Sequence, residues 1–257
     1  MSEELEKAFS STCRLLLGKG LEGLTQYSSW LGKSVPLPKE TKSAISGKEV
    51  WVPPPNIYLK KEFNPKNAIS LDEMENANTA PFGPEELDGA SVQEIVKKIK
   101  PISYYCGNFR YWTHSNIERS SGAGAGQNIM MCDDVYLKVK NIAYCNYALY
   151  SENLFGCHGV MHSGFLMHAY HSTKVTRCFE IDACSNCSGL LFSHNCENVH
   201  DSMFCFNAKN MRNAIGNVAV PPNEYKRIKE LLQQEIVKEL EDKKSFRYDV
   251  FNIGCMN

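Results

Sequence analysis

The residues best suited to chemistry are thiols and imidazoles in the second half of the chain. Cys184 and Cys187 form a C-x-x-C pair, and further cysteines and histidines follow closely. The candidate metal ligands are Cys184, Cys187, His194, Cys196, His200 and Cys205. Zinc binds four thiolates or imidazoles in a tetrahedron, so this spacing permits a zinc site.

The same cysteines also belong to a repeat, which gives them a structural explanation. Cys187 holds the repeat position that Val175 and Val199 hold in other units, and Cys184 shares its position with Ala208. A position that valine or alanine also fills needs no metal ion. We therefore assign no metal ligand and no cofactor, and keep zinc as an alternative.

Histidines crowd one part of the chain, since all seven lie between residues 114 and 200. The densest group is His158, His162, His168 and His171. These four would line a groove or a metal site, or would form ordinary hydrogen bonds at bends, which is the interpretation we favour. Cys157 precedes His158, but neighbours in a strand point to opposite faces, which disfavours a nucleophile–base pair.

Two pairs of carboxylates are the other candidates for catalysis. Asp133 and Asp134 are adjacent, whereas Glu180 and Asp182 lie two apart in one predicted strand and hence on one face. Glycoside cleavage needs two carboxylates at a defined separation, and neither pair recurs along the repeat. With no nucleophile, base and orienting group in view, we assign no catalytic residue.

The segment NFRYWTH, residues 108–114, places Arg110 among three aromatic residues. Such a cluster can stack bases or sugars. A strand with one buried aromatic face and a cation–π contact is the simpler interpretation. The following RSSGAGAGQN has no Gly-Lys-Ser/Thr and opens no helix, so we expect a flexible turn there and not a phosphate loop.

From Val139 the chain can be written in blocks of twelve residues. VKNIAYCNYALY and SENLFGCHGVMH are followed, after nine residues, by STKVTRCFEIDA, CSNCSGLLFSHN, CENVHDSMFCFN and a partial AKNMRNAIGN. An apolar or small residue that returns at fixed spacing predicts a solenoid. Because Asn, Ser and Gly disfavour helices, we expect short strands and bends that form a small right-handed β-solenoid.

Asparagine and cysteine have expected roles in this solenoid. Asn tolerates left-handed backbone at bends, and stacked Asn side chains form hydrogen-bonded ladders. Small thiols suit a crowded interior. Since a coil of a β-helix usually needs more than twelve residues, we expect two blocks per coil and three or four coils. The helices at the two ends of the chain would then cap the solenoid.

The segment before the repeat divides into helices and an extended arm. Ser2 caps a helix whose face carries Leu5 and Phe9, and a second short helix follows. Prolines spaced through residues 34–90 exclude long helices and central strands. We interpret this segment as a Pro-rich arm that packs on its own body or on a neighbour; a partly disordered linker is the alternative.

Two further helices are predicted from their caps. Ser91 and Glu94 form a capping box for a short helix that ends at Pro101. Asn223 caps an amphipathic C-terminal helix, and the tail FRYDVFNIGCMN alternates like a strand that would pair with an edge or a partner. The predicted organisation is residues 1–33, N-terminal helices; 34–90, arm; 91–217, short helix and β-solenoid; and 218–257, C-terminal helix and tail.

Composition limits the classes of function. The 257 residues carry a net charge of −1 at pH 7, which gives no general attraction for nucleic acid or anionic lipid. No run approaches the length of a membrane span, and the N-terminus lacks the features of a signal peptide. The 11 cysteines are therefore expected to be reduced thiols of a cytoplasmic protein.

The run NCSGLLFSHNCENVHDSMFCF, followed by KNMRNAIGN and the helix NEYKRIKELL, resembles Cys/Asn-rich β-solenoid repeat proteins of tailed phages and small-genome bacteria. The resemblance covers roughly residues 139–232. It implies a phage structural or assembly setting, and it supplies no catalytic residues.

Together these observations predict a non-enzymatic structural or assembly protein, in particular a virion component of the phage head or connector. Its solenoid would be a rigid block, and its arm would clasp other protein subunits in a homo- or hetero-oligomer. The alternatives are a carbohydrate-acting β-helix enzyme and a zinc-stabilised binding module.

Overall fold

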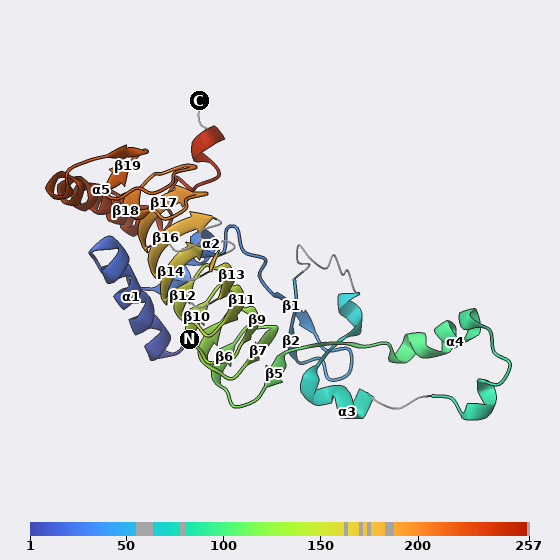
Figure 1. Cartoon of the computed structure of the whole chain (residues 1–257). Helices are drawn as coiled ribbons and strands as arrows, with labels where there is room; N and C mark the ends of the chain where they lie inside the picture. The colour runs from blue at the N-terminus through green and yellow to red at the C-terminus, as the bar shows by residue number, and fades with distance from the viewer. Residues whose placement is uncertain are drawn as a thin grey trace.

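The fold is described from a computed structural model. The structure describes residues 1–54, 64–77, 81–161, 164–169, 172–173, 176–182 and 188–255. A β-solenoid forms the body, helices lie along its flank, and a small module with a projecting segment lies at one end (Figure 1). Among the described residues, no helix combines the length and the apolar character that crossing a membrane requires.

Two sheets of parallel strands form the solenoid. The smaller sheet holds β5 (Phe109–Tyr111), β7 (Gly122–Gly124), β9 (Asp133–Tyr136), β11 (Asn146–Leu149), β13 (His158–Met161) and β15 (Ser172–Thr173). The larger sheet holds β6 (Ser115–Glu118), β8 (Gly126–Met130), β10 (Val139–Ala143), β12 (Glu152–Phe155), β14 (Gly164–Ala169), β16 (Thr176–Asp182), β17 (Ser188–His194), β18 (His200–Met203), β19 (Ala214–Ile215) and β20 (Val218–Ala219). The prediction of a mainly β protein with a solenoid is confirmed.

Each coil contains one block of twelve residues, so the expected two blocks per coil and three or four coils were wrong. In the larger sheet Lys140 pairs with Glu152, Glu152 with Gly164, and Gly164 with Thr176. The chain turns this tightly because left-handed residues recur every third position. In the last coils they are Asn195, Asn198, Asp201, Phe204, Asn207, Asn210 and Asn213, with φ between 44° and 53°.

The unit of the solenoid is thus a triplet, and four triplets make a coil. The residue after each left-handed position faces the interior, as Cys196, Val199 and Cys205 do. The nine residues that seemed to interrupt the repeat are three triplets, and β14 continues the twelve-residue register through them. Every third residue faces the interior, so moving the block boundaries by three residues keeps the inward-facing positions inward-facing. The blocks before and after the nine residues therefore begin at different points of one continuous repeat.

The solenoid begins earlier than the repeat could show. Register steps of thirteen, Phe109 to Gly122 and Gly126 to Val139, break the period in the first coils. The segment RSSGAGAGQN contributes β7 and the start of β8, so the expected flexible turn was wrong. Its glycines are needed for close packing: a Cβ on Gly124 would lie 2.6 Å from the Tyr111 carbonyl oxygen.

Cysteine and serine alternate in the interior because they make the same hydrogen bond. Cys132 and Cys145 donate their thiols to the carbonyl two residues earlier, at 3.2 and 3.3 Å. Ser151 and Ser202 donate their hydroxyls to the equivalent carbonyls at 2.7 and 2.8 Å. Both side chains are small, and both give a second hydrogen bond to a carbonyl that already accepts a backbone amide of the next coil, as the Met130 and Ala143 carbonyls do. The expected role of the thiols as core residues is confirmed for the described cysteines of the coils.

The outer face of the larger sheet is covered by helices. They are α1 (Glu3–Leu17), the 3-10 turn η1 (Leu24–Tyr27), α2 (Ser28–Leu31) and α5 (Pro222–Lys243). A column of apolar side chains on this face, including Phe155, Phe179 and Met203, is buried against them. Ser2 caps α1 by accepting a hydrogen bond from the Leu5 amide at 3.2 Å, as predicted. α5 starts with Pro222, one residue before the expected cap Asn223.

The first end of the solenoid is covered by a small module and not by the N-terminal helices. The module contains the hairpin β1 (Lys39–Lys42) and β2 (Glu49–Val52), and β3 (Ala68–Ser70) paired with β4 (Tyr105–Gly107). The backbone amide of Asn108 donates a hydrogen bond to the Trp51 carbonyl at 3.0 Å, which attaches the hairpin to the first coil. The expectation that α1 caps this end was wrong, because its apolar face packs along the flank.

At the other end the parallel ladder stops in a hairpin. β20 runs antiparallel to β19, with Ala214 opposite Ala219. An antiparallel strand ends the parallel register, so another coil cannot simply be added. The parallel ladder thus ends in β20, which is the edge strand of the larger sheet.

A segment that includes α4 (Val92–Ile99) projects from the small module, away from the solenoid (Figure 1). Ser91 and Glu94 form the predicted capping box. Short turns complete the described elements: η2 (Pro65–Asn67), η3 (Leu71–Glu73), α3 (Met74–Ala77), η4 (Pro84–Glu86), η5 (Lys100–Ile102) and η6 (Ile253–Cys255).

Candidate functional site

The most distinctive surface is the apolar face of α4. Val92 is 79% exposed, Val96 53% and Ile99 39%, and Ile95 is half-buried. The sequence predicted this face, and no other described part of the chain covers these three side chains. A soluble protein seldom leaves the apolar stripe of an amphipathic helix in water without a use for it.

Local contacts hold α4 against the turn that precedes it. Lys98 forms an ion pair with Glu86 at 2.6 Å, and its ammonium lies 5.8 Å from the centre of the Phe82 ring. Lys97 and Lys100 are exposed and form no ion pair within the described part of the chain. The last turn of the helix is therefore positively charged beside its apolar face.

An apolar pocket of about 240 Å³ lies between α5 and the C-terminal tail, near the opposite end of the solenoid. Its lining residues are Phe204, Leu232, Glu235, Ile236, Phe246, Tyr248 and Ile253. Glu235, on the exposed side of α5, is the one charged residue in this lining. The guanidinium of the nearby Arg247 is held by Glu239 at 2.9 Å.

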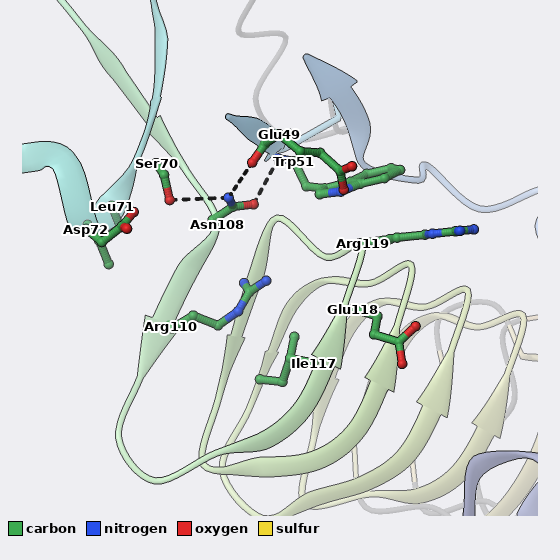
Figure 2. Close-up of a pocket in the computed structure, with 10 residues that line it drawn as sticks. All are labelled: Glu49, Trp51, Ser70, Leu71, Asp72, Asn108, Arg110, Ile117, Glu118 and Arg119. Carbon is green, nitrogen blue, oxygen red and sulfur yellow. Dashed lines mark hydrogen bonds between the residues drawn. The ribbon is translucent and has the colours of Figure 1, made fainter. Parts of the chain in front are cut away.

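A larger cavity, of about 680 Å³, lies between the small module and the first coil (Figure 2). Asn108 organises it: its amide nitrogen donates to the Glu49 carbonyl and to the Ser70 hydroxyl, both at 3.2 Å, and its amide oxygen accepts from the Trp51 amide at 2.9 Å. These bonds join three separate elements. The cavity therefore lies at the seam where the small module meets the solenoid.

Arg110 is the most unusual side chain of this cavity. Arg110 pairs with Ala123, and Ala123 pairs with Val135, so Arg110 belongs to a column of inward-facing residues. Its side chain therefore lies over the end of the first coil. Its guanidinium donates to the carbonyls of Phe109 and Ser120 at 2.8 and 3.0 Å. Burial lowers its pKa. Because both bonds satisfy end-of-coil carbonyls, Arg110 acts as a cap for the solenoid.

The candidate zinc ligands are divided by the coil. Cys196 and Cys205 face the interior and donate their thiols to backbone carbonyls, while His200 lies on the outside between Ser188 and Asn198. Burial raises the pKa of both thiols. His194 is half-buried beside the Phe206 ring, and Cys184 and Cys187 lie outside the described residues. No group of three or more metal-binding side chains gathers within the described ranges.

The crowded histidines do not form a described cluster. His158 is buried and follows Cys157, which faces the interior and donates to the Phe155 carbonyl at 3.7 Å. Cys157 and His158 thus face different sides of the coil, as the strand pattern predicted. His162 and His171 lie outside the described residues, as does the side chain of His168.

The adjacent carboxylates Asp133 and Asp134 separate across the backbone. Asp133 is buried in a column of polar residues and accepts from the Ser121 hydroxyl at 2.6 Å and from the Asn146 amide at 3.4 Å. Burial raises its pKa to about 6. Asp134 is exposed on the other side. The two carboxylates share no surface on which a substrate would lie.

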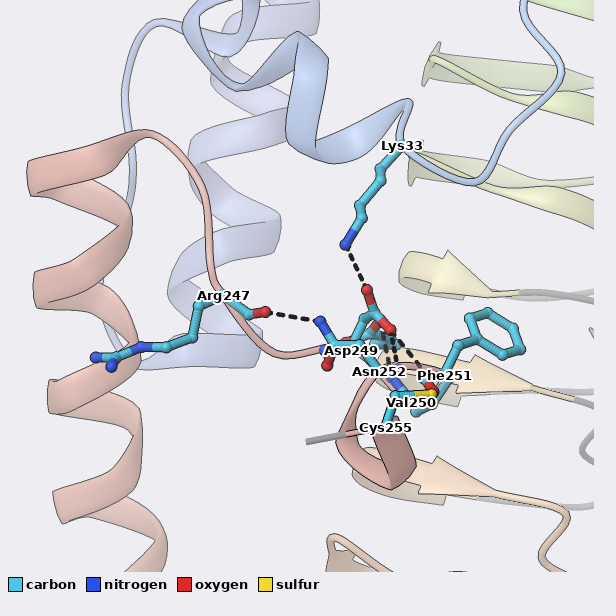
Figure 3. A network of polar contacts seen from close by, with 8 residues as sticks. Lys33, Arg247, Asp249, Val250, Phe251, Asn252 and Cys255 are labelled. Carbon is cyan, nitrogen blue, oxygen red and sulfur yellow. Dashed lines mark hydrogen bonds and ion pairs between the residues drawn. The ribbon is translucent and has the colours of Figure 1, made fainter. Parts of the chain in front are cut away.

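Glu180 lies under the C-terminal tail, where it accepts a hydrogen bond from the Val250 amide at 3.3 Å. Burial, and then the neighbouring Asp249, raise its pKa to about 8. Lys33 forms an ion pair with Asp249 at 2.5 Å and so joins the N-terminal segment to the tail (Figure 3). Glu180 is thus a contact of the tail, and the side chain of Asp182 lies outside the described part.

The tail folds as turns that end in η6, and not as the expected strand. Asp249 accepts hydrogen bonds from the amides of Phe251 and Asn252 at 3.0 and 2.7 Å, and the Asn252 side chain donates to the Arg247 carbonyl at 2.8 Å (Figure 3). Phe246 packs on Phe192 of the solenoid with 5.3 Å between ring centres. Side-chain capping by Asp249 and Asn252 overrides the alternating pattern.

The aromatic residues of NFRYWTH form an exposed cluster on a corner of the first coils. Tyr111 is 5.9 Å from Trp112 and 6.0 Å from Tyr136, measured between ring centres. The predicted cation–π contact is not formed, since Arg110 turns away toward the end of the coil. The apolar pocket beside α5 and the cavity at the seam were not predicted, because they join segments that are far apart in the sequence.

Neither a protein-family model, nor a curated protein sequence, nor a solved structure matches this chain.

Proposed function

We propose that this chain is a non-enzymatic assembly protein, in which the solenoid is a rigid block and the projecting α4 binds a neighbouring protein subunit. The observation that carries the proposal is the exposed apolar face of Val92, Val96 and Ile99. Burying such a stripe against a partner is the usual way in which an amphipathic helix is recognised. The phage-like resemblance of the repeat region supports a virion setting.

The rest of the molecule suits this role. The hairpin β1–β2 and β3, which lie in the predicted arm of residues 34–90, belong to the body of the protein. We therefore move the clasping role from the arm to the projecting segment around α4, which follows it in the sequence. The parallel ladder of the larger sheet ends in the short antiparallel strand β20, which disfavours the addition of a further parallel coil there. Of the catalytic candidates, Asp133, Glu180 and Cys157 make structural contacts of the fold.

Replacing Val96 by Glu tests the proposal. Glu keeps the helix propensity and places a charge on the apolar face. Gln93→Glu makes the same change of charge on an exposed position of the same helix and is the matched control. We expect native mass spectrometry of the protein purified from its producing cells to show wild type and Q93E in complexes of defined stoichiometry, and V96E as the 29.0 kDa monomer.

Complexes that survive V96E unchanged would rule out α4 as the binding element. Monomers in all three preparations would rule out the assembly role.

A further inference from the structure

We infer that the partner of α4 is a second copy of this chain, and that α4 docks in the apolar pocket beside α5. The inference rests on the proposed assembly function and names its partner. The two surfaces lie at opposite ends of the molecule (Figure 1). A subunit cannot fill its own pocket with a helix at its far end, but the next subunit can supply one.

The two surfaces match in polarity. α4 offers the branched side chains of Val92, Val96 and Ile99, and the pocket offers aromatic and aliphatic walls and about 240 Å³ of space. Removing both surfaces from water is the driving force for docking.

The surfaces also match in charge. Lys97 and Lys100 lie beside the apolar face of α4, and Glu235 lies at the pocket. The other carboxylate near this part of α5, Glu239, is already held by Arg247 and Lys243 at 2.9 and 3.4 Å. Docking α4 with its last turn toward Glu235 brings opposite charges together, which fixes the orientation of the helix.

Such a contact is head-to-tail, because each copy inserts its α4 into one neighbour and accepts the α4 of another neighbour in its own pocket. A contact of this kind leaves a free α4 at one end and a free pocket at the other end of every open oligomer. It therefore builds a ring if the rotation closes and an open filament if it does not. A single short helix buries a small area, so the association is expected to be weak and to depend on concentration.

Mixing two defective variants tests the head-to-tail geometry. Val96→Glu removes the donor helix, and Ile253→Glu places a charge in the pocket. We expect the purified wild type to form a concentration-dependent series of multiples of 29.0 kDa in sedimentation velocity. Each variant alone is expected to be monomeric. Their mixture is expected to stop at the dimer, since it holds one intact helix and one intact pocket per pair.

The results that would overturn the inference differ from those that would overturn the assembly role. An α4–α4 contact would leave I253E fully associated. A purified wild-type chain that stays monomeric would exclude the second copy as partner, while a complex from the producing cells that V96E destroys would still uphold the assembly role.

A charge exchange provides a test that does not depend on I253E folding. Glu235→Lys alone, and Lys97→Glu with Lys100→Glu, are each expected to weaken self-association at least several-fold, because like charges then face each other. All three changes in one chain are expected to restore it. No recovery in the triple variant would overturn the proposed orientation.

Discussion

At the scale of single residues, asparagine is the side chain best suited to the left-handed bends, which other residues such as Leu137 and Tyr144 also occupy. Asn128, Asn141 and Asn153 each have φ near 55° and are linked by amide hydrogen bonds of 2.8 and 2.9 Å. The left-handed conformation is strained for most other L-residues, whereas Asn adopts it readily. The Asn side chain also forms a hydrogen bond to the Asn of the next coil. One residue type thus supplies both the bend and the bond between coils.

Substitution of Asn141 separates these two contributions. We expect Asn141→Gly to lower the free energy of unfolding by about 1 kcal/mol, since it keeps the left-handed bend and loses only the ladder. Asn141→Ala is expected to lower it by about 2–3 kcal/mol, because the strained bend is added. Urea denaturation measures both. Equal losses would mean that the bend contributes nothing.

Glu180 predicts a dependence of stability on pH. Its pKa is raised to about 8 in the folded protein, so folding favours the protonated form. The carboxyl is protonated in both states at pH 4, and between the ordinary glutamate pKa and pH 8 only the unfolded chain ionises. Stability is therefore lost as the pH rises through this window.

Glu180→Gln removes this loss because the amide oxygen still accepts from Val250 without carrying a charge. We expect it to raise the free energy of unfolding at pH 8 by about 1–3 kcal/mol and to change it little near pH 4. Glu152→Gln, an exposed position of β12, is the matched control. Thermal unfolding at the two pH values measures the effect, and an equal gain at both would contradict the burial argument.

At the scale of elements, the helices act as a cover for one sheet. Phe9 of α1 is fully buried and packs edge-on against Phe155, with 5.3 Å between ring centres, and against Tyr27 at 5.6 Å. The described interior of the solenoid is filled by aliphatic side chains and thiols, and the buried aromatic side chains gather at this flank instead. Much of the stability should therefore come from this flank.

Truncation of Phe9 checks that expectation. We expect Phe9→Ala to lower the free energy of unfolding by about 3–5 kcal/mol, the usual cost of emptying an aromatic core position. Leu15→Ala on the same helix changes a side chain that is 54% exposed, and its expected effect is within about 0.5 kcal/mol. Chemical denaturation of both variants gives the comparison. Similar losses in both would show that α1 does not seal the sheet.

At the scale of the whole molecule, each end of the solenoid carries attached elements of this chain. The hairpin β1–β2 covers the first coil, and β20 ends the ladder antiparallel. Two apolar surfaces lie near the two ends, the face of α4 and the pocket beside α5. The assembly proposed above follows from this arrangement, and the mixing experiment examines it at the same scale.

The sequence by itself determined the local structure. It predicted the helices, the cap Ser2, the capping box of α4 with its apolar face, the solenoid, the asparagine ladders and the buried thiols, because each depends on neighbours within one or two coils. The expected cap Asn223 was wrong, since α5 begins at Pro222. It did not determine the coil length, since a triplet repeat is compatible with any number of triplets per coil. Only the strand register shows that four triplets close a coil.

Only the tertiary structure decided where distant segments meet. The helices lie along the flank because their apolar side chains pack on the apolar column of the larger sheet, and no local pattern reveals that column. The division of the candidate zinc ligands between the inside and the outside of the coil also depends on the register. So do the burial of Glu180 under the tail and the pocket beside α5, since each is formed by side chains that lie far apart along the chain and are brought together only by packing.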